Sequence, residues 1–202
     1  MNHAAPPGPK SATFLRAMEA DFPGFHVLYK AGDPIQRAVS MFLCLVTLGG
    51  MRTYLSRYHT VMFGALWVSP AWDQMSDDAC YVLLRHERVH LRQRARYGEL
   101  GMALRYLVGG LPLGACWGRA RIEWEAYEET IRATFEVYGE REMRALRPWL
   151  IERFCGPDYG WMWPFPDQVG AWFDACAADT ACASGPGNER KFAAPQSRPP
   201  TQ

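Results

Sequence analysis

The sequence predicts an α+β domain with one small sheet, in which short strands come first and long helices follow. Residues 25–70 contain segments rich in β-branched and aromatic residues, a composition typical of strands. Residues 76–156 contain three long segments that each end at a glycine, as many helices do. The expected elements, in chain order, are a strand at 25–30, a helix from Pro34 to the Gly49-Gly50 pair, strands at 51–58 and 60–70 with a tight turn near His59, helices at 76–98, 119–139 and 140–156, and an aromatic turn with a short helix at 159–178.

Local signals set several of the helix boundaries. Asp33 is a favourable N-cap residue, and Pro34 suits the first helical position after it. Ser76 caps the following long helix, and the two aspartates after it complement the positive end of the helix dipole. Gly98 then ends this helix.

Composition favours one folded domain between two tails. The chain has 202 residues, of which 49% are hydrophobic, and this is enough for one sizeable core. Residues 1–12 and 183–202 are rich in Pro, Gly and Ala, so we expect disordered tails around a domain at 13–182. The net charge of +1 gives no bulk electrostatic basis for a nucleic-acid partner or an anionic membrane.

Two uncharged runs, 38–51 and 106–118, are the candidates for membrane insertion. Both are shorter than the ~18 residues that a spanning helix needs, so we expect no transmembrane segment. They are buried segments of a soluble protein or, at most, surface-anchoring ones. The N-terminus lacks the apolar region of a signal peptide, which makes the cytoplasm the default location.

The six cysteines are scattered, with no CxxC pair among them. A chain of this length with so many core residues does not need a disulfide framework, and cysteines in apolar contexts behave as small core residues. The sequence does not decide whether Cys176 and Cys182 form a disulfide.

The segment RHERVH at 85–90 places two histidines four residues apart on a predicted helix. Residues i and i+4 share one helix face, so His86 and His90 can present imidazole nitrogens to one metal ion. Glu87 projects beside that site, where its carboxylate can act as general base for a metal-bound water. Zinc takes such donors in a tetrahedral set. We therefore expect one Zn²⁺ ion and a third protein ligand elsewhere in the chain.

That third ligand is not a histidine shortly downstream. Relative to the HExxHxxGxxH arrangement of the metzincins, the chain has Gln93 at the glycine position and Arg96 at the position of the third histidine. The remaining option for the third ligand is a carboxylate from a later helix, and the segment IEWEAYEE contains four glutamates. These are Glu123, Glu125, Glu128 and Glu129.

At this point the chain resembles the gluzincin metallopeptidases, in which a downstream helix supplies a glutamate ligand. Several of those families carry that glutamate in the pattern Glu, aromatic, any residue, Ala, Asp. The segment Glu123-Trp124-Glu125-Ala126-Tyr127 matches four of these five positions. The order of elements resembles the smallest members, the minigluzincins, over roughly residues 24–135.

The resemblance implies a zincin-like fold, in which a small mixed sheet with a cleft-lining edge strand precedes an active-site helix and a glutamate-bearing helix. The implied zinc ligands are His86, His90 and Glu123, and Glu87 is then the catalytic base. The strand at 60–70, immediately before the active-site helix, takes the place of the edge strand. The other three glutamates are expected to be solvated surface charges.

One position departs from the family pattern. The aspartate that steadies a histidine ligand is Tyr127 here, a phenol on the same helix face as Glu123 that could accept from an imidazole N–H. It raises ligand basicity less than a carboxylate does. Tyr127, Tyr159 and the arginines are the candidates for stabilising an oxyanion.

The function expected from these residues is a zinc-dependent metallopeptidase that hydrolyses a peptide or protein substrate. The alternative is a catalytically inactive zinc-binding module of the same fold, which acts as a binding or scaffold protein. An open fourth metal position beside Glu87 distinguishes the enzyme from a site closed by another side chain, such as a cysteine. A membrane-surface protein that uses 38–51 or 106–118 ranks below both.

The aromatic segment at 158–166 leaves two interpretations open. Pro164 and Pro166 keep it out of a helix, and its four aromatic residues are too many to face water together. Either it packs behind the helices and completes the core, or it borders the zinc cleft with Tyr159 or Trp161 near the substrate.

Overall fold

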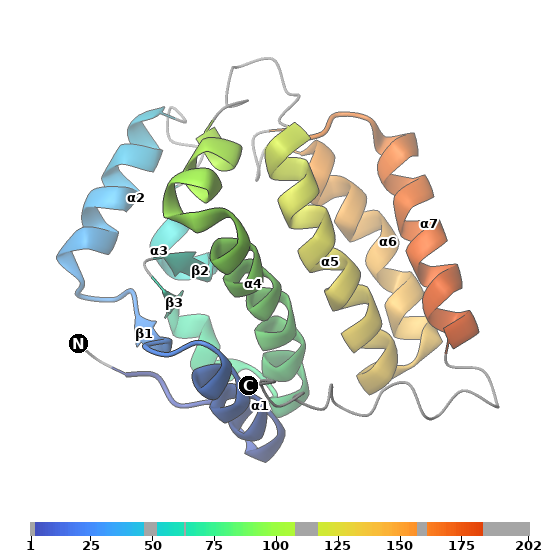
Figure 1. Ribbon diagram of the computed structural model, residues 1–202. Helices are drawn as coiled ribbons and strands as arrows, with labels where there is room; N and C mark the ends of the chain where they lie inside the picture. Colours follow the sequence, from blue (N-terminus) through green and yellow to red (C-terminus); the bar gives the residue numbers. More distant parts are fainter. Residues whose placement is uncertain (1–2, 47–51, 63, 108–116, 157–160, 184–202) are drawn as a thin grey trace, which may run out of the picture.

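Figure 1 shows the computed structural model, which describes residues 3–46, 52–62, 64–107, 117–156 and 161–183. It is a mostly helical α+β structure with one small sheet, as the sequence predicts. In chain order the elements are α1 (Pro9–Asp21), β1 (His26–Tyr29), α2 (Pro34–Val46), α3 (Tyr54–Arg57), β2 (Thr60–Met62), β3 (Ala65–Val68), a 3₁₀ helix (Pro70–Gln74), α4 (Asp77–Leu107), α5 (Trp117–Tyr138), α6 (Glu140–Cys155) and α7 (Pro166–Ala183).

The sheet has the order β1-β3-β2, with β1 parallel and β2 antiparallel to β3. Every residue of the central strand β3 is buried. The outer edge of β1 is covered by the N-terminal segment, because His3 forms a bridge with Leu28 and the amide of Ala4 donates to the Val27 carbonyl. Among the described residues, no strand or bridge pairs with the outer edge of β2.

Two of the three predicted strands were placed incorrectly. The segment 51–58 contains the short helix α3, and 60–70 is a hairpin of β2 and β3 instead of one long strand. Gly64, with φ of +78°, makes the hairpin turn, because a glycine adopts this conformation without steric cost. Tertiary contacts hold α3: the Tyr54 hydroxyl donates to Gln36 at 2.8 Å. Such contacts override strand propensity.

The segment expected to be a disordered N-terminal tail, 1–12, already contains the start of α1 at Pro9. The reason is a contact from a distant part of the chain. The carboxylate of Asp77 accepts from the backbone amides of Lys10 at 2.9 Å and Ser11 at 2.7 Å. A negative charge at the first turn satisfies helix amides that otherwise lack partners, so α1 forms where composition predicts disorder. Residues 184–202, the other predicted tail, lie outside the described residues.

The predicted boundary signals of α2 and α4 are confirmed. Asp33 accepts from the amide of Gln36 at 2.9 Å, and Ser76 accepts from the amide of Ala79 at 3.1 Å. Gly98 has a non-helical φ of 70° and ψ of 169°, so it interrupts α4 at the predicted position, although the helix continues beyond it. The Gly49-Gly50 pair lies outside the described residues.

Helices α4 and α5 pack along each other, and α6 and α7 extend the layer beyond α5 (Figure 1). The sheet packs against α1 and α4 through one apolar cluster that includes Leu66, Val68 and Leu84. A second cluster joins α5, α6 and α7 around residues such as Ile131 and Phe154. Helix α4 therefore lies between the sheet and the helical layer, with side chains directed to both.

The described part of the aromatic segment packs on this helical layer. Met162 is fully buried, and the ring of Trp163 stacks on Trp172 with centroids 6.0 Å apart and an interplanar angle of 23°. Trp161 is 54% exposed, so a core role for that residue is wrong. Tyr159 lies outside the described residues.

Cys176 and Cys182 are free thiols, the first buried and the second exposed. Both lie on α7, where six residues correspond to a rise of about 9 Å. That separation exceeds the limit of about 7 Å between the Cα atoms of a disulfide, so the helix itself prevents the bridge. None of the described helices combines the length and the apolar character needed to cross a membrane.

Candidate metal centre

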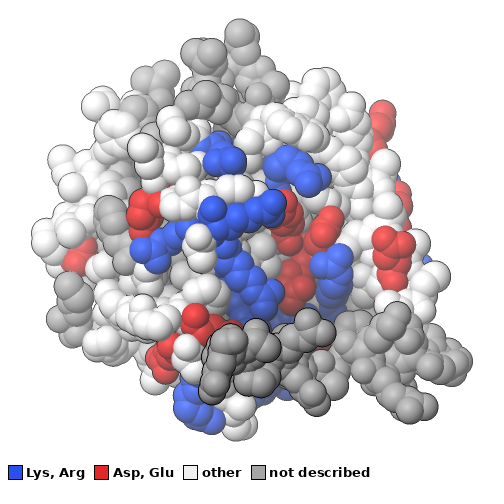
Figure 2. Space-filling view, in the orientation of Figure 1, with Lys and Arg blue, Asp and Glu red and all other residues white. Residues whose placement is uncertain are grey.

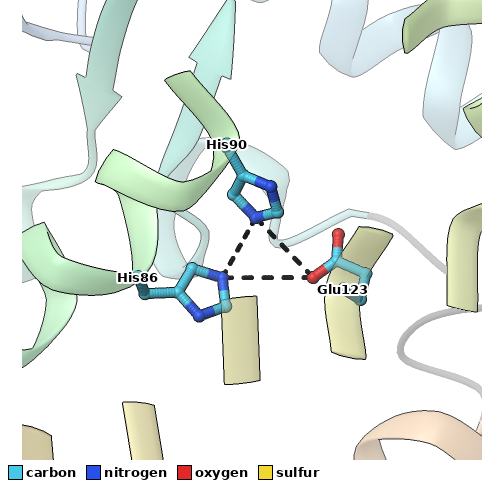
Figure 3. Close-up of side chains that lie close together, drawn as sticks. All are labelled: His86, His90 and Glu123. Atoms are coloured by element: carbon cyan, nitrogen blue, oxygen red, sulfur yellow. Dashed lines mark hydrogen bonds and ion pairs between the residues drawn. The ribbon is translucent and has the colours of Figure 1, made fainter. Parts of the chain in front are cut away.

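The three predicted metal ligands meet where α4 and α5 face each other (Figure 3). The Nε2 atoms of His86 and His90, both on α4, lie 3.1 Å apart. Oε2 of Glu123, on α5, lies 4.0 Å from Nε2 of His86 and 3.9 Å from Nε2 of His90. His90 and Glu123 are buried and His86 is half-buried. Of the four candidate glutamates, Glu123 is therefore the one that the fold brings to both histidines.

The orientation of His90 is fixed by Gln93, one turn further along α4. The amide nitrogen of Gln93 donates to the Ile122 carbonyl and to Glu125, both at 3.0 Å. Its amide oxygen therefore faces Nδ1 of His90 at 2.9 Å and accepts a hydrogen bond from Nδ1–H. In the neutral ring Nε2 then carries a lone pair, which is directed toward His86 and Glu123.

The orientation of His86 is fixed from α5 in the same way. Its Nδ1 lies 3.0 Å from Oγ1 of Thr130, whose own hydroxyl donates to the Ala126 carbonyl at 3.2 Å. The Thr130 oxygen must accept from Nδ1–H, which leaves Nε2 of His86 as an acceptor. Burial, and then the neighbouring His90, lower the pKa of His86 well below its usual value, so the ring is neutral at physiological pH.

Thr130 thus has the role that the sequence suggested for Tyr127. Tyr127 is 4% exposed, and its ring lies edge-on to His86 with centroids 4.8 Å apart. It packs against the imidazole from the same helix face as Glu123. A role for Tyr127 in stabilising an oxyanion stays a prediction, as does that of Tyr159.

The donor set suits a metal ion. A tetrahedral ion with ligand bonds of about 2.0–2.2 Å needs donor atoms about 3.3 Å apart, close to the 3.1 Å between the two histidine nitrogens. The carboxylate of Glu123 has to shift by less than ~1 Å to complete such a set. A cation between the two nitrogen lone pairs also offsets their repulsion. Two imidazoles and a carboxylate are suitable for zinc and for several other divalent transition metals.

The remaining glutamates of α5 are not all solvated, as the sequence interpretation assumed. Glu125 receives the hydrogen bond from Gln93 and so supports the orientation of His90. Glu129 forms an ion pair with Arg85 of α4 at 2.5 Å. Glu128 pairs with Arg132 along its own helix at 3.4 Å, with about a third of its side chain exposed.

Glu87 lies beside the three ligands and is 5% exposed. Burial raises the pKa of its carboxyl group to about 7, and the neighbouring Glu123 contributes in the same direction. His90 and Lys30 act in the opposite direction and lower this pKa. A carboxyl group with a pKa near neutrality can both accept and release a proton, which is the property of a general base that later acts as an acid.

The sequence interpretation missed Lys30, which is fully buried at the end of β1. Its ammonium group donates to Oγ1 of Thr60 at 2.8 Å and lies 3.6 Å from the centre of the Tyr54 ring. Burial lowers the pKa of Lys30 to about 7, while the charge of Glu87 raises it. Burial and then Lys30 also lower the pKa of His59, to about 4. Lys30 therefore links the sheet electrostatically to the carboxylate beside the candidate metal centre.

Gln93 and Thr130 were missed as supporting residues, although their spacing contains a signal. Gln93 follows His86 by seven residues, and Thr130 follows Glu123 by seven. Two helical turns bring such residues back to the same face. Lys30 had a weaker signal, a charged residue that follows directly after an apolar strand.

Comparison of the chain with protein-family models, with curated proteins and with solved structures finds no match.

Replacing Thr130 by valine tests the support of His86. The variant keeps the shape of the side chain but removes the acceptor, so the imidazole loses its fixed orientation. We expect zinc affinity to fall by about 10–100-fold, measured by competition with a chromophoric chelator. Thr134→Val, a buried threonine one turn further along α5, is the matched control and keeps parental affinity. Equal affinity in the two variants would contradict the assignment.

Lys30→Met tests the burial of the lysine. In the folded chain the pKa of Lys30 is about 7, against 10.5 for the free side chain. Between these values the unfolded chain holds a proton that the folded chain lacks, so stability rises with pH. We expect the free energy of unfolding of the parent, relative to Lys30→Met, to rise by ~1–3 kcal/mol between about pH 7 and 9.5, measured by urea denaturation. A difference that stays constant over this range would show that Lys30 keeps an ordinary pKa.

Proposed function

We propose that the chain is a zinc-dependent peptidase of gluzincin type, with a zincin-like arrangement of α4 and α5 against the sheet. One observation carries the proposal: two imidazoles and one carboxylate converge within 4.8 Å of one another, beside the buried carboxyl group of Glu87. The ligand histidines and Glu87 come from α4, and Glu123 comes from α5. Hydrolases that use a metal-activated water need this combination of three protein ligands and a base.

A bound zinc ion supplies a Lewis acid and a water of lowered pKa. His86, His90 and Glu123 would hold such an ion. Glu87 would accept the proton of the attacking water, because its buried carboxyl group lies beside the three ligands. The same carboxyl group then delivers that proton to the amine that leaves the cleaved peptide bond.

The unpaired outer edge of β2 suits an extended substrate. The sequence interpretation gave this role to a strand spanning 60–70, but β3 is the central strand and β2 provides the edge. Strand β2 also contacts α4, the helix that carries His86, Glu87 and His90. A peptide that pairs with the outer edge of β2 adds a strand to the sheet through backbone hydrogen bonds. Such binding positions a peptide bond without demanding particular side chains.

The competing function, a zinc-binding module without activity, requires a closed metal site. Within the described parts of the chain, the candidate metal group consists of His86, His90 and Glu123 alone. None of the five described cysteines joins this group. Both observations favour the enzyme.

Glu87→Gln tests the proposed function. The amide cannot accept the proton of the attacking water, so we expect cleavage of a peptide library to fall by about 10²–10⁴-fold. Zinc content stays at the parental level, because Glu87 is not a ligand. Glu128→Gln changes a half-buried glutamate of α5 that pairs with Arg132 and is not part of the metal group; it is the control and keeps parental activity. Parental cleavage by the Glu87 variant, or a parent protein that binds zinc but cleaves no peptide, would refute the peptidase assignment.

A further inference from the structure

Helix α2 directs four large apolar side chains away from the protein. The face toward the protein is anchored by a polar residue, since the fully buried Gln36 accepts a hydrogen bond from the Tyr54 hydroxyl. The outward face carries large hydrophobic residues. These are Ile35 (53% exposed), Met41 (75%), Phe42 (60%) and Leu45 (75%). An amphipathic helix in a globular protein normally has the opposite orientation, so this face is built for contact with something else.

The end of α4 extends the same kind of surface. Beyond the interruption at Gly98, Leu100 is 74% exposed and Leu104 is 50% exposed, and they share one helix face at i and i+4. The last turns of α4 and the upper part of α2 lie toward the same end of the molecule in Figure 1. In Figure 2 the surface over α2 is mostly white, whereas charged side chains gather in the middle of the molecular face that the figure shows. We call these six exposed residues of α2 and α4 the apolar end.

The charges in the stretches that form the apolar end are all positive. No aspartate or glutamate occurs in residues 34–72 or 100–122. The same two stretches contain six arginines, Arg37, Arg52, Arg57, Arg105, Arg119 and Arg121. Of these, Arg37 lies on α2 itself, and both Arg37 and Arg105 are exposed. Arg37 and Arg105 therefore place positive charge next to exposed apolar side chains, while the neighbouring Glu99 is paired with Arg94.

We infer that the apolar end docks on the surface of an anionic lipid bilayer, with α2 lying in the plane of the interface. Large apolar side chains on one helix face, bordered by arginine and lacking acidic residues, are the features of an interfacial helix. The aliphatic side chains enter the acyl boundary, while the arginines reach the phosphate groups of the lipids. The chain attaches to the membrane from one side, consistent with helices that are not suited to span it.

A second copy of the chain fits this surface less well. In a two-fold symmetric dimer each patch meets the identical patch of the other copy. The arginines next to one apolar end would then lie close to those of the other copy, and like charges at an interface oppose association. Anionic lipid headgroups complement the same charges. The charge distribution therefore favours the bilayer over self-association.

Co-sedimentation of the full-length protein with vesicles tests the inference, independently of any hydrolysis. We expect binding to vesicles of phosphatidylcholine mixed with phosphatidylglycerol, and weak binding to phosphatidylcholine alone. Phe42→Asp and Leu45→Asp each lower the affinity by about tenfold, because each removes one large apolar contact. Arg37→Gln and Arg52→Gln each lower it by about fivefold, the contribution of one basic residue near an anionic surface.

Matched controls come from the far side of the helical layer. Phe165→Asp changes a phenylalanine that is 43% exposed just before α7, and Arg141→Gln changes an arginine on α6 whose side chain is 93% exposed. Both bind vesicles as the parent does. The inference fails if the parent does not sediment with anionic vesicles, or if Phe42→Asp and Leu45→Asp bind as tightly as the controls. A stable dimer in light scattering that these two substitutions dissociate would assign the surface to a second copy and overturn the inference.

Discussion

The packing of α4 against α5 is the interaction on which the rest of the structure depends. The two histidines come from one helix and the carboxylate from the other, so the metal group exists only while these helices keep their register. Polar contacts fix that register at several levels: Gln93 donates to the Ile122 carbonyl, His86 donates to Thr130, and Arg85 pairs with Glu129. A slide of one residue along either helix would break all of them together. The same contacts between α4 and α5 therefore fix both the register of the two helices and the positions of the three ligands.

That interface is costly to build, because it buries polar groups that water would otherwise solvate. Glu87, His90, Gln93 and Glu123 are each at most 8% exposed, and Lys30 on the sheet side is fully buried. Buried polar groups are tolerated when each has partners, and here the partners are shared between α4, α5 and the sheet. Burial also produces the chemistry, since it raises the pKa of Glu87 and lowers that of His86. Natural proteins accept such costs mainly at functional sites.

Signals within one helix could be read from the sequence. His86 and His90 share a face by their spacing alone, and the caps at Asp33 and Ser76 depend only on residues three positions away. The choice of Glu123 among four glutamates needed a family pattern, because spacing along α5 does not show which carboxylate faces α4. Glu125, two residues further along α5, also contacts a residue of α4, because it accepts a hydrogen bond from Gln93.

Features that depend on contacts between distant residues could not be predicted. Helix α1 forms because Asp77 caps it across more than sixty positions of sequence. Helix α3 replaces a predicted strand because Tyr54 is anchored by Gln36. The apolar pattern of α2 was recognised, but the pattern of a helix gives its apolar face and not the direction in which that face points. For this reason residues 38–51 were expected to be buried or surface-anchoring, and the structure places Met41, Phe42 and Leu45 at the surface.

The most direct measurement is a crystal structure of the zinc-loaded protein, with anomalous diffraction recorded at the zinc absorption edge. We expect one strong anomalous peak about 2.0–2.2 Å from Nε2 of His86, Nε2 of His90 and a carboxylate oxygen of Glu123. Its fourth position would hold solvent within hydrogen-bond distance of Glu87. A peak at other residues, no peak at saturating zinc, or a fourth protein side chain that closes the coordination sphere would contradict the account.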